Sequence, residues 1–172
     1  CLEIRGYIMA NPMYGQNKAD SDIDVFGRGK VNVIANGGTD YKLSVEDSGA
    51  VCLFDTAAAS SFELPAPAAG LEFTFVSTIL ATSDHVIKTN TLNTDGFLGG
   101  VSAESTTAAK GDTFSADADG SNDHMTFDGA TTGGGAGQCI KVVAINTENW
   151  AVSGTTHCVG SSTATCFGDA QL

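Results

Sequence analysis

Between Leu43 and Val76 the chain alternates short apolar runs with turn residues, and this pattern constrains the fold more than any other feature. Leu71, Phe73 and Phe75 occupy every second position, which places them on one face of a strand. The segment 65–70, PAPAAG, contains two prolines that cannot donate to a sheet and a glycine that permits positive φ, so the chain turns there. The pattern predicts three strands, at 51–54, 62–64 and 71–75.

A further pair of strands is expected before this stretch. The apolar run at 31–35 is followed by Asn36-Gly37-Gly38, which is a hairpin signal, and then by an alternating run at 41–45. After the stretch, the residues at 85–89 are expected to form another strand.

The C-terminal part of the chain contains a second hairpin signal. Apolar runs at 139–145 and 150–154 flank a turn-forming segment, and the second run begins with Trp150, the only tryptophan. We therefore expect a hairpin that carries this side chain into the core. The predicted core is built around Phe73, Phe75, Val142 and Trp150.

The spacing of these runs predicts the fold class. No segment keeps an apolar period of 3.6 residues, and short apolar runs recur about every 8–12 residues. This is typical of an all-β domain, here over residues 31–172, built as an antiparallel sandwich or barrel that is jelly-roll-like. Residues 9–30 are polar and rich in turn formers, so we expect residues 1–30 to form an extended N-terminal arm that is either disordered or ordered by a neighbour.

The net charge of −12 excludes functions that need a basic surface. Eight Lys and Arg residues, scattered along the chain, stand against 20 Asp and Glu residues. A nucleic-acid partner requires clustered Lys and Arg, and an acidic surface repels anionic membranes, so neither partner is expected. Charged residues are 16% of the chain. A surface rich in small neutral residues suits close packing against other subunits.

The sequence offers no catalytic motif. It lacks the G-x-S-x-G nucleophile elbow, and His85, His124 and His157 have no distinguishing neighbours, so they are interpreted as coincidental surface histidines. The segment 133–137, GGGAG, is not followed by the Gly-Lys-Ser/Thr of a phosphate-binding loop, so it is expected to be a loop between strands. We expect neither enzymatic activity nor a cofactor.

The best metal candidate is the acidic segment 117–123. Asp117, Asp119 and Asp123 stand at alternate positions and can converge on a hard cation such as calcium. However, Asn122 occupies the position where an EF-hand loop has glycine, and flanking helices are not expected. A solvated acidic turn is the alternative interpretation, and these three residues are weak candidates.

The cysteines allow several arrangements. They are Cys1, Cys52, Cys139, Cys158 and Cys166. Cys52 and Cys139 lie in apolar runs and are expected to be small buried hydrophobes. Cys158 and Cys166 flank a flexible segment and either close a disulfide or remain thiols. A zinc site from Cys139, His157, Cys158 and Cys166 would lack paired C-x-x-C spacing.

Two blocks of the sequence resemble small virion structural proteins of tailed bacteriophages, especially those of marine phages. Residues 43–75 have the form D-S-G, apolar strand, F-x-L-P-x-P-x-x-G-L-x-F-x-F. Residues 121–154 run from N-D-x-x-x-F-D-G to W-x-V-x-G, and the opening MANPMYGQNKADS is also similar to the start of such a protein. The cysteines at 158 and 166 depart from the usual tail.

The resemblance implies a capsid decoration, or cement, protein. Such a protein is assembled in the host cytoplasm, binds the major capsid protein on the outside of the virion head and associates with its own copies, commonly as a trimer. The rival interpretation is a tail or head fibre module that binds a host-surface glycan. A lipoprotein is a further alternative if Cys1 is lipidated, whereas a natural start at Met9 would make the first eight residues an upstream extension.

Overall fold

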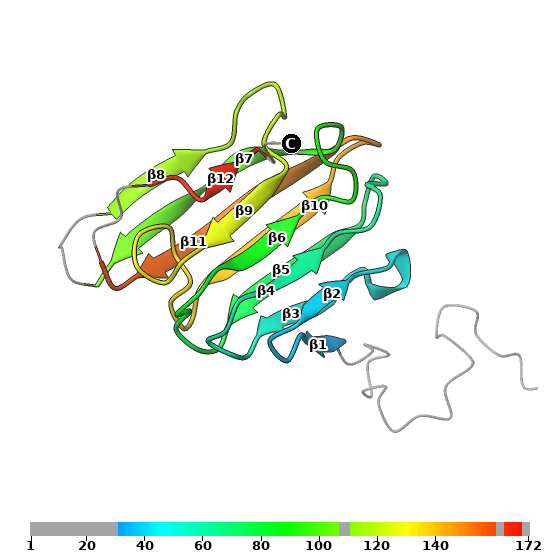
Figure 1. The fold of residues 1–172 in the computed structure, drawn as a ribbon. Coiled ribbons are helices and arrows are strands. Elements are labelled where there is room, and N and C mark those ends of the chain that lie inside the picture. The colour runs from blue at the N-terminus through cyan, green and yellow to red at the C-terminus, as the bar shows by residue number, and fades with distance from the viewer. Residues whose placement is uncertain (1–30, 107–110, 161–163, 170–172) are drawn as a thin grey trace, which may run out of the picture. The chain divides into compact units, whose positions relative to one another are not determined.

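The computed structural model describes residues 31–106, 111–160 and 164–169, which form a β-sandwich of two mixed sheets (Figure 1). The all-β sandwich expected from the sequence is confirmed. The arm predicted for residues 1–30 lies outside the described residues. In the described part of the chain, no helix is long and apolar enough to cross a membrane.

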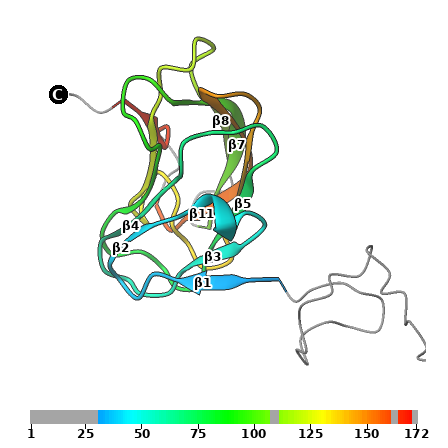
Figure 2. The ribbon, with the colours of Figure 1, turned by 90° about the vertical axis from the view of Figure 1, so that its right-hand side faces the viewer.

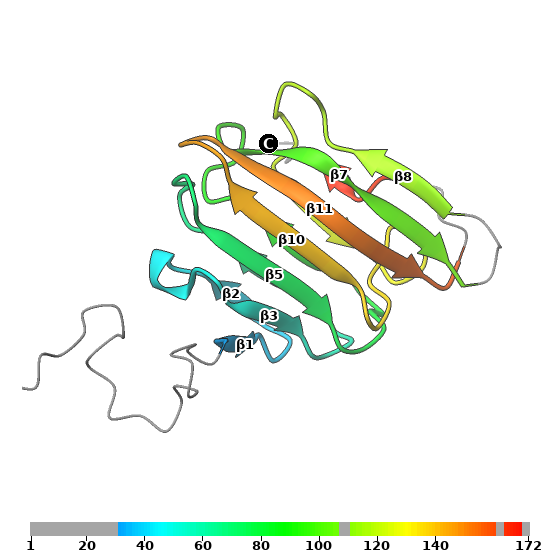
Figure 3. The ribbon, with the colours of Figure 1, turned by 180° about the vertical axis from the view of Figure 1, so that it is seen from behind.

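The larger sheet has seven strands in the order β1-β3-β5-β10-β11-β7-β8 (Figure 3). Their bounds are β1 Val33–Ala35, β3 Val51–Phe54, β5 Glu72–Ser77, β7 Gly96–Ser105, β8 Gly111–Ser115, β10 Cys139–Ala144 and β11 Asn149–Cys158. The smaller sheet has five strands in the order β12-β9-β6-β4-β2. Their bounds are β2 Asp40–Lys42, β4 Ser60–Glu63, β6 His85–Lys88, β9 His124–Phe127 and β12 Phe167–Gly168, and a 3₁₀ turn, η1, spans Val45–Asp47.

The strand pairing corrects the expectation of an antiparallel sandwich. From β1 to β6 the chain alternates between the two sheets, so that each strand lies beside the strand two places earlier and runs in the same direction (Figure 2). The pairs β1–β3, β3–β5, β2–β4 and β4–β6 are parallel, as is β11–β7. The other five pairs are antiparallel.

The hairpin predicted at Asn36-Gly37-Gly38 is wrong, although a tight turn forms there. The amide of Thr39 donates to the Asn36 carbonyl over 3.1 Å, and Gly37 and Gly38 have φ values of 61° and 75°. The turn connects β1 in one sheet to β2 in the other. A turn signal predicts that the chain reverses, but not which sheet the next strand joins.

The hairpin predicted in the C-terminal part is confirmed. Strands β10 and β11 pair antiparallel from Cys139 opposite Thr155 to Ala144 opposite Trp150. Trp150 is fully buried and its ring centroid lies 5.9 Å from that of Phe73. Its side chain is therefore part of the core, as expected.

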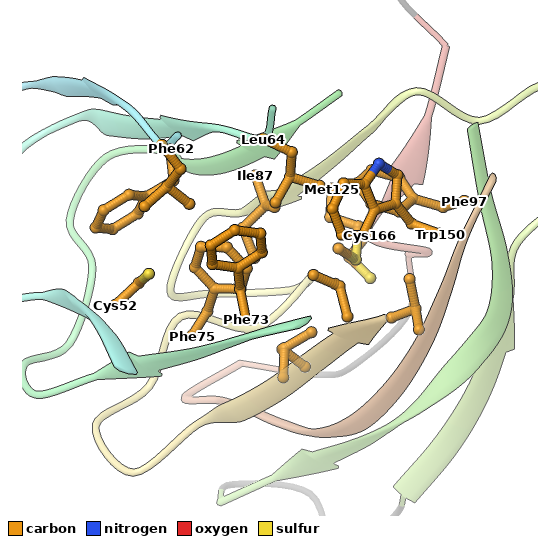
Figure 4. Packing of buried hydrophobic residues seen from close by; sticks show 14 of the residues in the cluster. Cys52, Phe62, Leu64, Phe73, Phe75, Ile87, Phe97, Met125, Trp150 and Cys166 are labelled. Carbon is orange, nitrogen blue, oxygen red and sulfur yellow. The ribbon is translucent and has the colours of Figure 1, made fainter. Parts of the chain in front are cut away.

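Aromatic side chains from both layers meet in the core (Figure 4). Phe62 of β4 packs against Phe54 and Phe75 of the opposite sheet, with ring centroids 5.1 and 5.5 Å apart. All four predicted core residues are at most 1% exposed: Phe73, Phe75, Val142 and Trp150. The alternation in β5 explains this packing, because its odd-numbered residues from Phe73 to Ser77 point inward and its even-numbered residues point outward.

Candidate functional site

The two sheets present different chemistry on their outward faces. On the five-stranded sheet, Lys42, Glu63, Lys88 and His124 stand side by side on adjacent strands. The Lys42 ammonium lies 2.6 Å from the Glu63 carboxylate, and the Lys88 ammonium lies 3.8 Å from it. We call this surface the charged face, and its outward residues are Asp40, Lys42, Ser61, Glu63, Val86, Lys88, His124 and Thr126. It is an ordinary solvated sheet face.

The outward face of the seven-stranded sheet carries few charges, and Glu104 of β7 and His157 of β11, whose side chains lie 3.6 Å apart, stand at one corner of it. One row of paired residues crosses every strand without a charge: Ala35, Leu53, Val76, Cys139, Thr155, Ser102 and Thr113. The next row contains Val33, Val51, Thr74, Lys141 and Ser153, and the third contains Glu72, Val143, Ala151 and Leu98. We call these three rows the neutral face.

Two charges within the neutral face neutralise each other. The ammonium group of Lys141 on β10 lies 2.7 Å from the carboxylate of Glu72 on β5. Much of the remaining surface is apolar and partly or fully exposed. Leu53, Val76 and Val143 are half-buried, whereas Val33 is 56% exposed.

The neutral face is unusual because it is largely apolar at outward strand positions of a strongly acidic domain. Outward positions of sandwich strands are commonly polar, and a contiguous apolar surface marks an interaction site. Residues 31–172 contain sixteen acidic and four basic residues, whereas residues 1–30 contain four of each, so the whole net charge of −12 belongs to the β domain. The neutral face is thus a surface without net charge on a strongly acidic body.

The structure does not gather the three metal candidates into a site. Asp123 is fully buried, and its carboxylate accepts a hydrogen bond from the Asn93 amide at 3.1 Å and lies 2.8 Å from Nδ1 of His124. Asp119 accepts a hydrogen bond from the Ser121 amide at 3.1 Å, within its own turn. Across the described residues, no group of three or more His, Cys, Asp or Glu side chains is placed to hold a metal ion. The carboxylates of Asp119 and Asp123 therefore stabilise loop conformations through hydrogen bonds.

The glycine-rich segment is a loop between β9 and β10, as the sequence predicts. The amide of Gly134 donates to the Gln138 side-chain oxygen at 2.6 Å, and the amide of Gly135 donates to the His157 carbonyl at 2.8 Å. The amide of Gly137 donates to the Ser77 carbonyl at 2.8 Å. Because these N–H groups already have partners, they are not offered to a phosphate.

The cysteines occupy four environments within the described residues. Cys52 and Cys166 are core residues. Burial raises the pKa of each thiol to about 12, and the charge of Asp47 contributes to the shift at Cys52.

The prediction that Cys139 is buried is wrong, because it is exposed on the neutral face. Cys158 donates to the Glu104 carbonyl at 3.6 Å, and no disulfide joins it to Cys166. Cys1 lies outside the described residues.

His85 contradicts its interpretation as a surface histidine. It is fully buried between the sheets, and its ring stacks on Phe54 with centroids 4.6 Å apart. Nε2 lies 2.9 Å from the Thr56 carbonyl, so this nitrogen carries the proton in the neutral ring and donates. Burial lowers the pKa of His85 below its usual value, although the carbonyls of Thr56 and Ala58 and the charge of Asp84 oppose the shift.

His85 predicts a component of stability that depends on pH. In the unfolded chain the His85 ring binds a proton near pH 6.5, whereas in the folded protein the same ring binds it only at lower pH. The stabilisation is therefore fully present above about pH 6.5 and is lost as the pH falls toward the folded pKa. Urea unfolding should show a shallower loss of stability on acidification for His85→Gln than for the wild type. The half-exposed His157→Gln is the control, and parallel pH profiles for His85→Gln and the wild type would refute the expectation.

The neutral face is the feature of the described residues best suited to a function. Sequence reasoning missed it, although the signal was present in β3 and β5, where apolar residues occupy outward as well as inward positions. No family model, curated protein or solved structure matched the chain.

Proposed function

We propose that this chain is a virion structural protein, a capsid decoration protein that binds the outer head shell of a tailed bacteriophage and stabilises it. The observation that carries the proposal is the neutral face, an extended surface without net charge on a strongly acidic sandwich. Such a surface suits association with protein, because it is desolvated at little electrostatic cost. The similarity of residues 43–75 and 121–154 to small phage virion proteins supports the choice of particle.

The rest of the chain is consistent with this role. Its net negative charge disfavours binding to packaged nucleic acid. Its partners are the major capsid protein and further copies of itself, for which the resemblance favours a trimer. In this proposal the arm of residues 9–30 reaches onto a neighbouring subunit or the underlying shell. A modest contact repeated around a symmetric particle gains affinity through multivalency.

The test uses capsids that lack the protein. Added full-length chain should decorate the heads and raise the temperature at which they rupture. A variant that lacks residues 1–30 should still fold, because the core cluster runs from Ile34 to Phe167, but it should attach to heads weakly or not at all. Circular dichroism checks folding, and sedimentation with capsids measures attachment.

Two results would count against these assignments. Full occupancy of heads by the truncated chain would show that residues 1–30 are not the anchor. An intact chain that ignores heads but binds host cells or their glycans would replace decoration with the fibre interpretation.

A further inference from the structure

We propose that the neutral face binds the neutral face of a second copy of this chain, so that two sandwiches pack sheet against sheet. This inference rests on the proposed function, because it names a partner for the same neutral face. It differs from the trimer that the resemblance favours, because one self-complementary surface gives a two-fold dimer, whereas a three-fold ring requires two different patches.

The neutral face is electrostatically complementary to itself, because it carries one Lys and one Glu side by side, and this favours a second copy as the occupant. Each β domain carries a large negative charge, so two copies repel each other when their acidic surfaces approach. On the neutral face this repulsion is small, since its two charges, Glu72 and Lys141, are paired. The charged face, by contrast, presents the ion pairs of Glu63 with Lys42 and Lys88, whose burial would require desolvating several charges.

The central strand of the sheet explains how the two copies align. Strand β10 is the fourth of seven strands, and it presents Cys139, Lys141 and Val143 outward. A two-fold axis near β10 places Lys141 of one copy close to Glu72 of the other, so the ion pair within each chain can be shared across the interface. Small side chains in the row that contains Cys139, such as Ala35 and Ser102, permit the backbones of the two copies to approach closely.

The size of the neutral face is sufficient for a transient contact. The three rows hold seven, five and four residues, and 16 outward positions at about 4.8 Å between strands and about 6.7 Å along them cover roughly 500 Å². Two such faces bury about 1,000 Å², which lies in the size range of weak, transient interfaces. We therefore expect a dimer that dissociates on dilution, not one that is permanent.

The first experiment compares two matched substitutions in the full-length chain. Val76 and Val86 are both half-buried, outward-facing valines, on β5 of the neutral face and on β6 at the centre of the five-stranded sheet. Sedimentation equilibrium should show a dimer for the wild type and Val86→Lys. Val76→Lys should raise the dissociation constant at least about tenfold, because symmetry buries two unpaired ammonium groups. Ser153→Lys, at an exposed position beside Lys141, gives the same test if Val76→Lys fails to fold.

The second experiment uses Cys139 as a probe of the covered surface. Trypsin cleavage after Lys110 and Lys141 releases a peptide whose only cysteine is Cys139, so its alkylation can be followed separately from the other thiols. Iodoacetamide should modify it slowly in concentrated wild-type protein and faster on dilution. In Val76→Lys it should react fast at every concentration.

The outcomes separate this inference from the proposed function. A wild-type monomer with reactive Cys139 overturns the second copy as occupant, and if heads then protect Cys139, the shell covers the face and the decoration role stands. An oligomer that survives Val76→Lys and Ser153→Lys, or in which Cys139 stays reactive, also overturns the inference. A dimer that Val76→Lys dissociates, but that does not bind heads, supports the inference and counts against decoration.

Discussion

Replacing Trp150 by alanine should lower the free energy of unfolding by about 3–5 kcal/mol, the usual loss when a large aromatic side chain leaves a packed core. Trp150 is fully buried on β11, with Ala144 and Phe97 as its register partners on the two neighbouring strands. Its ring also contacts Phe73, so the alanine variant leaves a cavity among residues of three other strands.

The matched control for this prediction is Trp150→Phe. Nε1 of Trp150 has no hydrogen-bond partner among the described residues, so the phenylalanine variant loses volume but no hydrogen bond. We expect it to be clearly less destabilised than the alanine variant. Urea unfolding followed by circular dichroism measures both variants, since tryptophan fluorescence is lost in each. An alanine variant that unfolds with the wild-type midpoint would show that the described packing around β11 is wrong.

Replacing Gly96 by alanine should lower the free energy of unfolding by about 2–3 kcal/mol or more, the upper part of the range of about 1–3 kcal/mol that is usual for overpacking. A Cβ atom at position 96 would lie 1.7 Å from the carbonyl oxygen of Gly120, which is a backbone atom. The loop that contains Gly120 cannot simply withdraw, because the Phe97 amide donates to the Asn122 carbonyl at 2.8 Å. The methyl group therefore forces either the start of β7 or this loop to move.

Gly111→Ala provides the control for Gly96→Ala. Gly111 is exposed on the edge strand β8, and a Cβ atom there would lie 3.3 Å from the Ala103 carbonyl oxygen. We expect a change within about 1 kcal/mol of the wild type, because replacing glycine in an accessible conformation chiefly reduces the entropy of the unfolded chain. Equal stability of the two variants in urea would contradict the close approach of the two backbones at Gly96.

Features set by neighbours in the chain were predictable from the sequence. The alternation around Phe73 and Phe75 identified a strand and its inward face, and the short turn between two apolar runs identified the β10–β11 hairpin. In both cases the information is local, since successive side chains of a strand point to opposite faces, and the two strands joined by the turn at 145–148 pair with each other. The all-β class follows from the same patterns.

The surroundings of the candidate metal ligands and of His85 were not predictable in this way. Nothing near Asp117, Asp119 and Asp123 in the sequence indicates that Asp123 is buried against His124 while Asp119 stays within its own turn. Likewise, the residues around His85 do not reveal that it stacks on Phe54 from the opposite sheet. Burial and partners at these positions depend on segments distant in the chain.

Local sequence patterns therefore predicted eight of the twelve strands that the structure describes, the core positions Phe73, Phe75, Val142 and Trp150, and the acidity of the domain, but not the strands β7, β8, β9 and β12. Which sheet each strand joins depends on tertiary structure. Strands β1 and β2, for example, are joined by a tight turn but belong to different sheets. The neutral face likewise depends on tertiary structure, because one of its rows takes one residue from each of seven strands between Ala35 and Thr155. Local patterns set the direction of each side chain, but only the packing and register of distant strands bring such residues together on one surface.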